Sequence, residues 1–317
     1  MQTTVLDAAD GNSIGQVVKF LQAGDVVALP TETVYGLAGD ALNTTAVARI
    51  FAAKDRPHFD PLIVHVANAA MAARVAHCDD PMVVALMKKF WPGPLTILLP
   101  KREIISDLVT AASPLVAVRM PSHPVFRAVL EEFGGPLAAP SANPFGRISP
   151  TKASHVVAGL GGRISLVLDC GKCLHGVEST IVYPKNGTLH LLREGPVTRE
   201  ELQAFGLLKS GTKNTAAPGQ LASHYAPRKP LRLVDSADDV RDRERAGFLA
   251  FTTKPVEFDT VEILSSKGDL VEATANLFAA LHRLDAAPID QIYAEKIPLV
   301  GLGCAIMDRL NRAAAIS

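Results

Sequence analysis

The chain has 317 residues, 48% of them hydrophobic, and its 32 Lys and Arg are balanced by 32 Asp and Glu. This length and apolar content predict about two domains with packed cores. The zero net charge argues against a protein whose main task is to coat nucleic acid, because such proteins usually carry a basic excess.

Strand and helix patterns alternate from residue 14 to about residue 205. Apolar residues at helical spacing predict helices over residues 14–23, 44–54, 82–90 and 154–159. Short apolar runs predict strands over residues 26–29, 62–66, 95–99, 116–119, 137–139, 166–169, 179–183 and 189–193. Because several strands follow one another without a helix between them, we expect a mixed sheet.

A change of composition near residue 207 divides the chain. Residues 209–220 are Gly, Thr, Asn, Ala and Pro without apolar periodicity, which is typical of a linker or an ordered loop. A second α/β pattern follows, with strands expected over 231–234, 246–251, 261–264 and 289–294 and helices over 236–245, 270–284 and 305–315. We therefore predict a first domain over residues 1–206, a linker over 207–229 and a small open-sheet domain over 230–317.

Targeting and redox signals are weak. The first 20 residues carry three charges and no long apolar core, so we expect no signal peptide, and no apolar run is long enough to cross a bilayer. Cys170 and Cys173 form one isolated C-x-x-C pair, whereas a structural zinc site would need a second pair or matching histidines. We expect reduced thiols, a cytoplasmic location and no metal held by the protein.

Residues 30–37, Pro-Thr-Glu-Thr-Val-Tyr-Gly-Leu, place polar side chains where the strand at 26–29 ends. Strand exits are where α/β proteins build ligand sites, and Gly36 would let a ligand approach the backbone closely. A strand-to-helix turn with Thr and Glu as local caps would give the same pattern. The segment is therefore either a pocket wall or a plain turn.

Four basic residues have a functional and a structural interpretation. Lys54 and Arg56, after the helix at 44–54, could clamp a phosphate or simply interact with the helix dipole. His65 lies in an apolar strand, where it is either a satisfied core residue or a group that binds a ligand beside a pocket. Arg119 ends another apolar strand and needs an anionic partner, which could be a structural Asp or a ligand carboxylate.

Residues 140–143, Pro-Ser-Ala-Asn, follow the strand at 137–139 and precede Ser149. Small hydroxyl residues with free backbone N–H groups suit a nucleotide phosphate or ribose, although an Asx or Ser turn is the alternative. The chain has no P-loop, no dinucleotide fingerprint and no nucleophile elbow. A nucleotide site would therefore have to be built from Lys, Arg, Ser and backbone amides.

Taken in order, these segments resemble the L-threonylcarbamoyladenylate synthase family, which has a YrdC-like domain followed by a smaller C-terminal domain. The matching segments are residues 30–37, 54–57, 61–65, 91–96, 119–121, 140–143, 149–151, 176–182, 193–195, 224–227 and 303–310. The resemblance implies an α/β fold with a twisted mixed sheet and a ligand cleft, plus a small Rossmann-like open-sheet domain. It also implies a reaction in which L-threonine, bicarbonate or CO2, and ATP give threonylcarbamoyl-AMP and pyrophosphate, with Mg2+ held mainly by ATP.

The same resemblance implies roles for individual residues. Threonine would be held by Thr33, His65, Arg119 and Ser179. ATP would be surrounded by Lys54, Arg56, Asp60, Ala139 through its backbone, Ser141, Asn143, Ser149, Arg193 and Tyr225. Of these, Lys54 and Arg56 would stabilise the charge that develops during the reaction. The linker would close over the nucleotide as a lid that excludes water. A partner transferase would then pass the threonylcarbamoyl group to tRNA beside the anticodon, with at most a weak tRNA contact here and no role for a membrane.

Three departures from the family pattern and two other functions stay open. Asp60 stands where the family usually has Asn, Phe145 replaces a usual small residue, and residues 221–223 lack the usual basic character. The chain could instead be a non-catalytic RNA-binding module, against which the balanced charge of both halves argues. It could also be a carbamoyl-AMP-forming carbamoyltransferase relative, but such proteins carry zinc-finger and acylphosphatase segments that this chain lacks.

Overall fold

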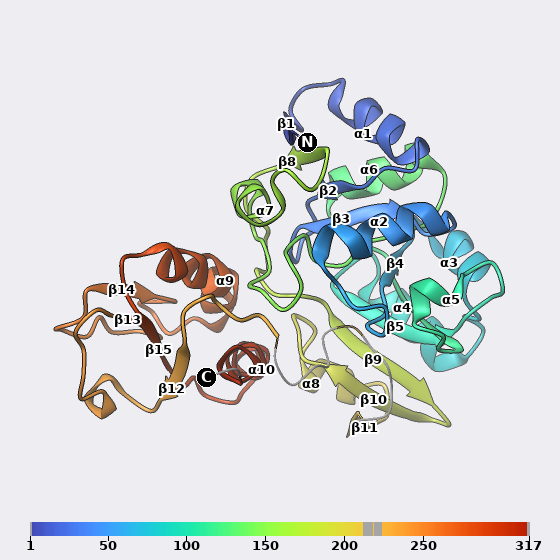
Figure 1. The fold of residues 1–317 in the computed structure, drawn as a ribbon. Helices are drawn as coiled ribbons and strands as arrows, with labels where there is room; N and C mark the ends of the chain where they lie inside the picture. The colour runs from blue at the N-terminus through green and yellow to red at the C-terminus, as the bar shows by residue number, and fades with distance from the viewer. Residues whose placement is uncertain (1, 212–217, 219–223, 316–317) are drawn as a thin grey trace.

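The computed structural model describes residues 2–211, 218 and 224–315, which form two sheets (Figure 1). Within these residues the larger sheet has the strand order β1-β8-β2-β3-β7-β4-β6-β5-β9-β10-β11. Its strands are β1 (Thr4–Asp7), β2 (Val27–Leu29), β3 (Gly36–Asp40), β4 (Ile63–His65), β5 (Leu95–Pro100), β6 (Leu115–Arg119), β7 (Leu137–Ala138), β8 (Leu166–Asp169), β9 (Thr180–Lys185), β10 (Thr188–Arg193) and β11 (Leu207–Ser210).

The larger sheet is mixed, as predicted. Parallel pairs such as β4 with β6 alternate with antiparallel pairs such as β4 with β7 and β5 with β6. This pairing places His65 directly beside Arg119 on the neighbouring strand, and Arg119 beside Thr96. The register of these three neighbouring strands, which lie inside the sheet, therefore brings polar groups together at the strand ends.

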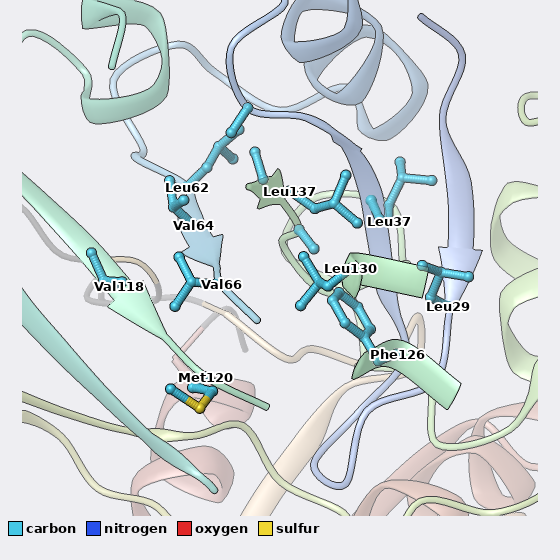
Figure 2. Close-up of a cluster of buried hydrophobic side chains, with 14 of the residues drawn as sticks. Leu29, Leu37, Leu62, Val64, Val66, Val118, Met120, Phe126, Leu130 and Leu137 are labelled. Carbon is cyan, nitrogen blue, oxygen red and sulfur yellow. The ribbon is translucent and has the colours of Figure 1, made fainter. Parts of the chain in front are cut away.

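Helices cover the larger sheet and close its core. They are α1 (Ser13–Gln22), α2 (Thr44–Lys54), α3 (Ala69–Val75), α4 (Pro81–Phe90), α5 (Asp107–Thr110), α6 (Pro124–Phe133), α7 (Ala153–Leu160) and α8 (Arg199–Gln203). Asn43 starts α2 by accepting hydrogen bonds from the N–H groups of Thr45 and Ala46. Figure 2 shows Phe126 and Leu130 of α6 pointing toward Leu37 and other buried side chains of the sheet. The apolar core is thus sheet against helix, as the alternating sequence pattern requires.

The smaller sheet is entirely parallel, with the order β12-β15-β13-β14. Its strands are β12 (Leu231–Val234), β13 (Ala246–Ala250), β14 (Thr260–Ile263) and β15 (Gln291–Glu295), and it packs with the helices α9 (Leu270–Ala286) and α10 (Leu302–Ala314). This arrangement confirms the small open-sheet domain expected in the C-terminal part. No helix among the described residues has both the length and the apolar character needed to cross a bilayer.

The helix predicted over residues 236–245 is wrong. Only Ala237–Asp239 form a single 3-10 turn, which Ser236 caps by accepting from the N–H of Asp238. The side chain of Arg243 then donates to the carbonyls of Val240 and Ala237, which a continuing helix would use for its own ladder. The segment also lacks an apolar face, so packing offers a helix little support. Helices α3, α5, α6 and α8 and the strands β1, β3 and β11 were not predicted.

The two parts of the chain touch through buried side chains. Val34, Ile148 and Val177 of the first part belong to the same apolar cluster as Tyr225, Phe278 and other residues of the second. Gly176 has φ +73°, and a Cβ there would lie 2.6 Å from the backbone oxygen of Ala275 on α9. The predicted domain boundaries stay predictions; β11 pairs with β10 and so adds residues 207–210 to the larger sheet. Much of the predicted linker, residues 212–217 and 219–223, lies outside the described residues.

Candidate active site

A pocket with about 540 Å³ of empty space, its mouth included, opens where several strands of the larger sheet end. It brings together nine of the residues predicted to bind ligands: Thr33, Arg56, His65, Ala139, Arg119, Ser141, Ser179, Arg193 and Tyr225. The other four, Lys54, Asp60, Asn143 and Ser149, do not line it but contact residues that do or lie within one or two positions of them. We call Thr33, His65 and Arg119 the sheet wall, and Arg56, Ser141, Glu178, Arg193 and Tyr225 the loop wall.

In the sheet wall, the Arg119 guanidinium is held by groups of the protein itself. It forms an ion pair with Glu32 (Nη2 to Oε1, 2.7 Å) and donates from Nη1 to the hydroxyl of Thr33 at 2.9 Å. Both side chains of the ion pair are only 4% exposed. The anionic partner that Arg119 requires is therefore a structural glutamate from the segment that follows β2.

The segment over residues 30–37 is both a turn and a pocket wall. The hydroxyl of Thr31 accepts hydrogen bonds from the N–H groups of Thr33 and Val34, at 3.1 and 3.2 Å, and donates to the carbonyl of Val34. Thr31 and Thr33 nevertheless both line the pocket. The segment is therefore a pocket wall. The alternative interpretation, a strand-to-helix turn with Thr and Glu as caps, is wrong, because the turn joins β2 to the antiparallel strand β3 and Glu32 pairs with Arg119.

Burial and neighbouring charge set the ionisation of the sheet wall. Burial, together with the nearby positive charge of Arg119, lowers the pKa of His65 to about 3. Burial opposes ionisation of Glu32, but the charge and hydrogen bond of Arg119 outweigh it, and the pKa of this carboxyl lies below its ordinary value. At neutral pH the wall thus combines a neutral imidazole with an ionised Arg–Glu pair.

In the loop wall, Lys54 and Arg56 leave the end of α2 in different directions. The Lys54 ammonium donates to the carbonyl oxygens of Ser141, at 2.5 Å, and of Asn143. Arg56 lines the pocket and forms an ion pair with Asp60 (Nη2 to Oδ2, 2.9 Å). Burial, and then the charge of Arg56, lowers the pKa of Lys54. Lys54 therefore anchors the loop after β7 from outside the pocket lining, while Arg56 lines the cavity.

Two hydroxyl residues on the loop-wall side are tied to charged neighbours. Arg193 donates from Nη2 to the hydroxyl of Ser179 at 3.0 Å and from Nε to its carbonyl at 2.9 Å. The hydroxyl of Ser149 donates to Oε1 of Glu178, which lines the pocket. Through these bonds the ends of β9 and β10 and the loop after β7 form one hydrogen-bonded rim.

Tyr225 closes the loop wall from the C-terminal part of the chain. Its ring lies 4.2 Å from that of His224, 5.6 Å from that of Phe278 and 5.0 Å from the guanidinium carbon of Arg309. Its φ of 64° is in the left-handed region, which non-glycine residues rarely adopt without support from neighbours. Phe145, one of the departures from the family pattern, lies between Arg56 and His224.

Eight residues that line the pocket were not among the predicted ligand contacts: Thr31, Val34, Gly36, Ile63, Pro140, Glu178, Pro218 and His224. Glu178 and His224 each stand next to a selected residue in the matching segments, and that adjacency was the available signal. Pro218 lies within the predicted linker, and its carbonyl accepts from Arg193 at 3.3 Å. A backbone contact of this kind leaves no signature in the sequence.

Metal-binding and redox candidates do not gather at the pocket. Among the described residues, no three His, Cys, Asp or Glu side chains are placed to hold one metal ion. The four cysteines are free, and burial raises the pKa of both Cys170 and Cys173 to about 12. These two residues are therefore protonated thiols near neutral pH.

Two family models match the chain. The Sua5/YciO/YrdC model, described as "Telomere recombination", matches residues 19–195, and the model "Threonylcarbamoyl-AMP synthase, C-terminal domain" matches residues 197–315. A threonylcarbamoyl-AMP synthase of Bacillus subtilis is 39% identical over 321 residues, covering 95% of this chain and 92% of the relative. One of Pyrococcus abyssi is 38% identical, covering 93% of this chain and 92% of the relative.

A solved structure has the same architecture over the whole length. The crystal structure of P. abyssi Sua5 complexed with L-threonine superposes with a TM-score of 0.89 at 36% identity and covers 98% of both chains. The likeness includes the smaller sheet as well as the larger one, since the superposition leaves almost none of the chain uncovered.

Proposed function

The chain belongs to the Sua5/YciO/YrdC family of threonylcarbamoyl-AMP synthases, and from that premise we propose how its pocket divides the reaction. It makes threonylcarbamoyl-AMP for tRNA modification. The sheet wall takes L-threonine, and the loop wall takes ATP. The observation that carries this division is one pocket in which a buried Arg–Glu pair faces a separate set of arginines and hydroxyls.

For threonine, the sheet wall offers groups of matching chemistry. Arg119 keeps a fixed orientation through Glu32 and Thr33, so it can pair with the amino-acid carboxylate at little cost in side-chain entropy. The hydroxyl of Thr33 and the neutral ring of His65 can hydrogen-bond the threonine hydroxyl and amine. Ser179, which lines the pocket from the adjoining loop-wall side, can add its hydroxyl to this set. A site that hydrogen-bonds the substrate hydroxyl rejects alanine or valine far better than an apolar slot rejects one methyl group.

For ATP, the loop wall offers cations and backbone amides in place of a P-loop. Arg56 and Arg193 face the cavity as planar forks suited to phosphate. Lys54 orients the loop of Ser141 and Asn143, whose polar groups lie beside the phosphates, and Tyr225 covers the nucleotide. Glu178 and Asp60 are both paired with arginines, so Mg2+ would be held mainly by ATP itself.

The chemistry then needs positioning and charge stabilisation, with no covalent intermediate on the protein. The neutral threonine amine first reacts with CO2 to give a carbamate and a proton, or with bicarbonate to give a carbamate and water. A carbamate oxygen attacks the α-phosphorus, the bond to the bridging oxygen breaks, and pyrophosphate leaves. Arg56 stabilises the negative charge that develops on these oxygens. Because the AMP part of ATP is transferred to the carbamate oxygen, we class the protein as a nucleotidyltransferase.

Hand-over of the product to a tRNA threonylcarbamoyl transferase, and a cytoplasmic location, are further parts of the proposal. The adenylate is labile in water, which gives a purpose to a cover over the pocket. The contact of Pro218 with Arg193 supports such a role for the linker. The full segment predicted as the lid includes residues outside the described part of the chain.

Pyrophosphate release tests the proposal directly. We expect release from ATP only when L-threonine and bicarbonate are both present, with threonylcarbamoyl-AMP detected by mass spectrometry. ATP turnover that depends on carbamoyl phosphate instead would favour the carbamoyltransferase relative. A complete lack of turnover with tight RNA binding would favour the RNA-binding module.

A further inference from the structure

We propose that Arg309, on the last helix of the chain, is a positioning residue for the nucleotide side of the pocket. The inference rests on the proposed function, because it assigns ATP to the loop wall. Arg309 does not line the pocket. It acts through Glu178 and Tyr225, which do.

The first observation is that Arg309 is fully buried, yet its donors bond to the other part of the molecule. Its side chain is 0% exposed, and Nε forms an ion pair with Oε2 of Glu178 at 2.9 Å. Nη2 donates to the carbonyl of Glu194 at 2.9 Å, and Nη1 pairs with Asp308 at 2.5 Å. Figure 1 shows α10 on the side of the smaller sheet that faces β9 and α8. A residue 131 positions distant thus neutralises a carboxylate in the wall of the larger sheet's pocket.

The second observation concerns the charge of the pocket. Glu178 lines the cavity, and an unpaired carboxylate there would repel the phosphates of a nucleotide. Arg309 compensates that charge from behind, while Ser149 bonds to the other carboxylate oxygen. Arg56 and Arg193 are then the loop-wall cations that line the cavity. Arg309 therefore sets the electrostatic sign of the loop wall without touching the ligand.

The third observation concerns Tyr225. The guanidinium of Arg309 lies over the Tyr225 ring, 5.0 Å from its centre, in a cation–π arrangement. One turn further along α10, the carbonyl of Arg312 accepts from the N–H of His224 at 3.3 Å. Helix α10 thus holds the His224–Tyr225 segment by backbone and side chain. These contacts help explain how Tyr225 keeps its left-handed backbone conformation.

The sheet wall gives an internal comparison. Arg119 is bonded to Glu32, Thr33 and Gly93, all within the larger sheet's part of the chain. A loss of Arg309 should therefore weaken nucleotide binding and leave threonine binding almost unchanged. A residue that only stabilised the contact between the two parts would weaken the binding of both substrates alike.

The test measures binding of a non-hydrolysable ATP analogue by calorimetry and the KM of each substrate in the pyrophosphate assay. For Arg309→Met we expect at least tenfold weaker analogue binding and a similar rise in the ATP KM, with the threonine KM changed less than threefold. Arg309→Lys keeps the charge but loses the planar fork, so it should recover part of the analogue affinity. In Arg309→Met/Glu178→Gln, the unpaired charge is gone, and the analogue should bind more tightly than to Arg309→Met alone.

The matched control is Arg245→Met, which breaks an exposed Arg–Asp pair of the same domain (Nε to Oδ2 of Asp290, 2.6 Å). This variant should change neither the analogue affinity nor the KM of either substrate. Analogue affinity within twofold of the wild type in folded Arg309→Met would overturn the proposal. Equal losses for both substrates, or no recovery in the double variant, would overturn it as well. If the wild type released no pyrophosphate with threonine and bicarbonate, the proposed function would fail, while analogue binding would still decide the role of Arg309.

Discussion

The two walls of the pocket are built in different ways. The sheet wall takes its side chains from neighbouring strands and the turn after β2, and its central charge, Arg119, is paired within the same sheet. The loop wall takes its side chains from loops and strand ends of the larger sheet and from Tyr225 of the C-terminal part, and Arg309 of the last helix supports it. The sheet wall is therefore a product of strand register, whereas the loop wall depends on contacts between two parts of the chain.

This difference separates two kinds of vulnerability. A change in the sheet wall removes a group that would bind threonine and also leaves a buried partner without its counter-charge. Threonine affinity and the free energy of unfolding should therefore fall together. A change at a residue that supports the loop wall acts on the ligand only through the position of a loop, so nucleotide affinity should fall less than threonine affinity falls when Arg119 is lost. Substrate-specific KM values and unfolding free energies can test each half of this comparison.

The largest effect is expected for Arg119→Met. It should raise the threonine KM at least a hundredfold, because the carboxylate loses its cation. It should also lower the free energy of unfolding by about 3–5 kcal/mol, because Glu32 is left buried and unpaired. Urea unfolding and the pyrophosphate assay measure the two effects.

The double variant Arg119→Met/Glu32→Gln separates them. Most of the lost stability should return with the glutamate neutralised, while threonine binding should stay poor. If threonine binding returned too, Arg119 would act on the fold alone and would have to be removed from the threonine site.

Lys54→Met should have the next largest effect, on the other wall. It leaves the carbonyls of Ser141 and Asn143 without their donor, and each buried, unsatisfied acceptor costs about 1–3 kcal/mol. The loop should shift, and the ATP KM should rise about tenfold while threonine binding without ATP changes little. Lys89→Met, at an exposed lysine near the end of α4, is the control. A threonine KM raised as much as the ATP KM would contradict the independence of the two walls.

A fall in pH should destabilise the folded protein through His65 of the sheet wall. Because its folded pKa is about 3 and its ordinary value is 6.5, the unfolded chain takes up a proton that the folded chain does not. Stability is therefore lost as the pH falls from 6.5 toward 3, by at most about 1.4 kcal/mol per pH unit for this one group.

Urea unfolding of His65→Asn between pH 6.5 and 4.5 checks this. The variant should show a shallower pH dependence than the wild type, whereas the exposed His77→Asn should keep the wild-type slope. The slope should not vanish, because burial also lowers the pKa of other histidines, such as His155 and His224. An unchanged slope in His65→Asn would mean that His65 is protonated to the same extent in both states.

The smallest effect is expected for Asp60→Asn. Asp60 neutralises Arg56 across 2.9 Å, so an amide there should leave more positive charge for the phosphates and lower the ATP KM two- to threefold. The stability should fall by about 1–2 kcal/mol, since a charge-assisted hydrogen bond becomes a weaker one. Thermal unfolding and the ATP KM measure these changes. A higher KM would indicate that the Asp60 carboxylate helps to hold Mg2+.

Much of the fold and of the site could be predicted from local sequence. The apolar runs located β2, β4, β5 and β6, because burial on both faces leaves little choice of residue type. The apolar runs of the smaller sheet located its strands as well. Strand β3, Gly36–Asp40, was missed because two of its five residues are glycines and its pattern is neither alternating nor β-branched. The charged segment at 236–245 was misjudged as a helix because charge alone says nothing about whether an apolar face exists.

The order and chemistry of the segments around Thr33, Lys54, His65 and Ser141 determined, by themselves, the family and the kind of pocket. Only the tertiary structure decided which groups are partners: Glu32 for Arg119, two carbonyls for Lys54, and Glu178 for Arg309. The physical reason is that a buried charge must be compensated by whatever lies within hydrogen-bond distance. Strand order and packing set that distance, and they join residues as far apart in the chain as Glu178 and Arg309.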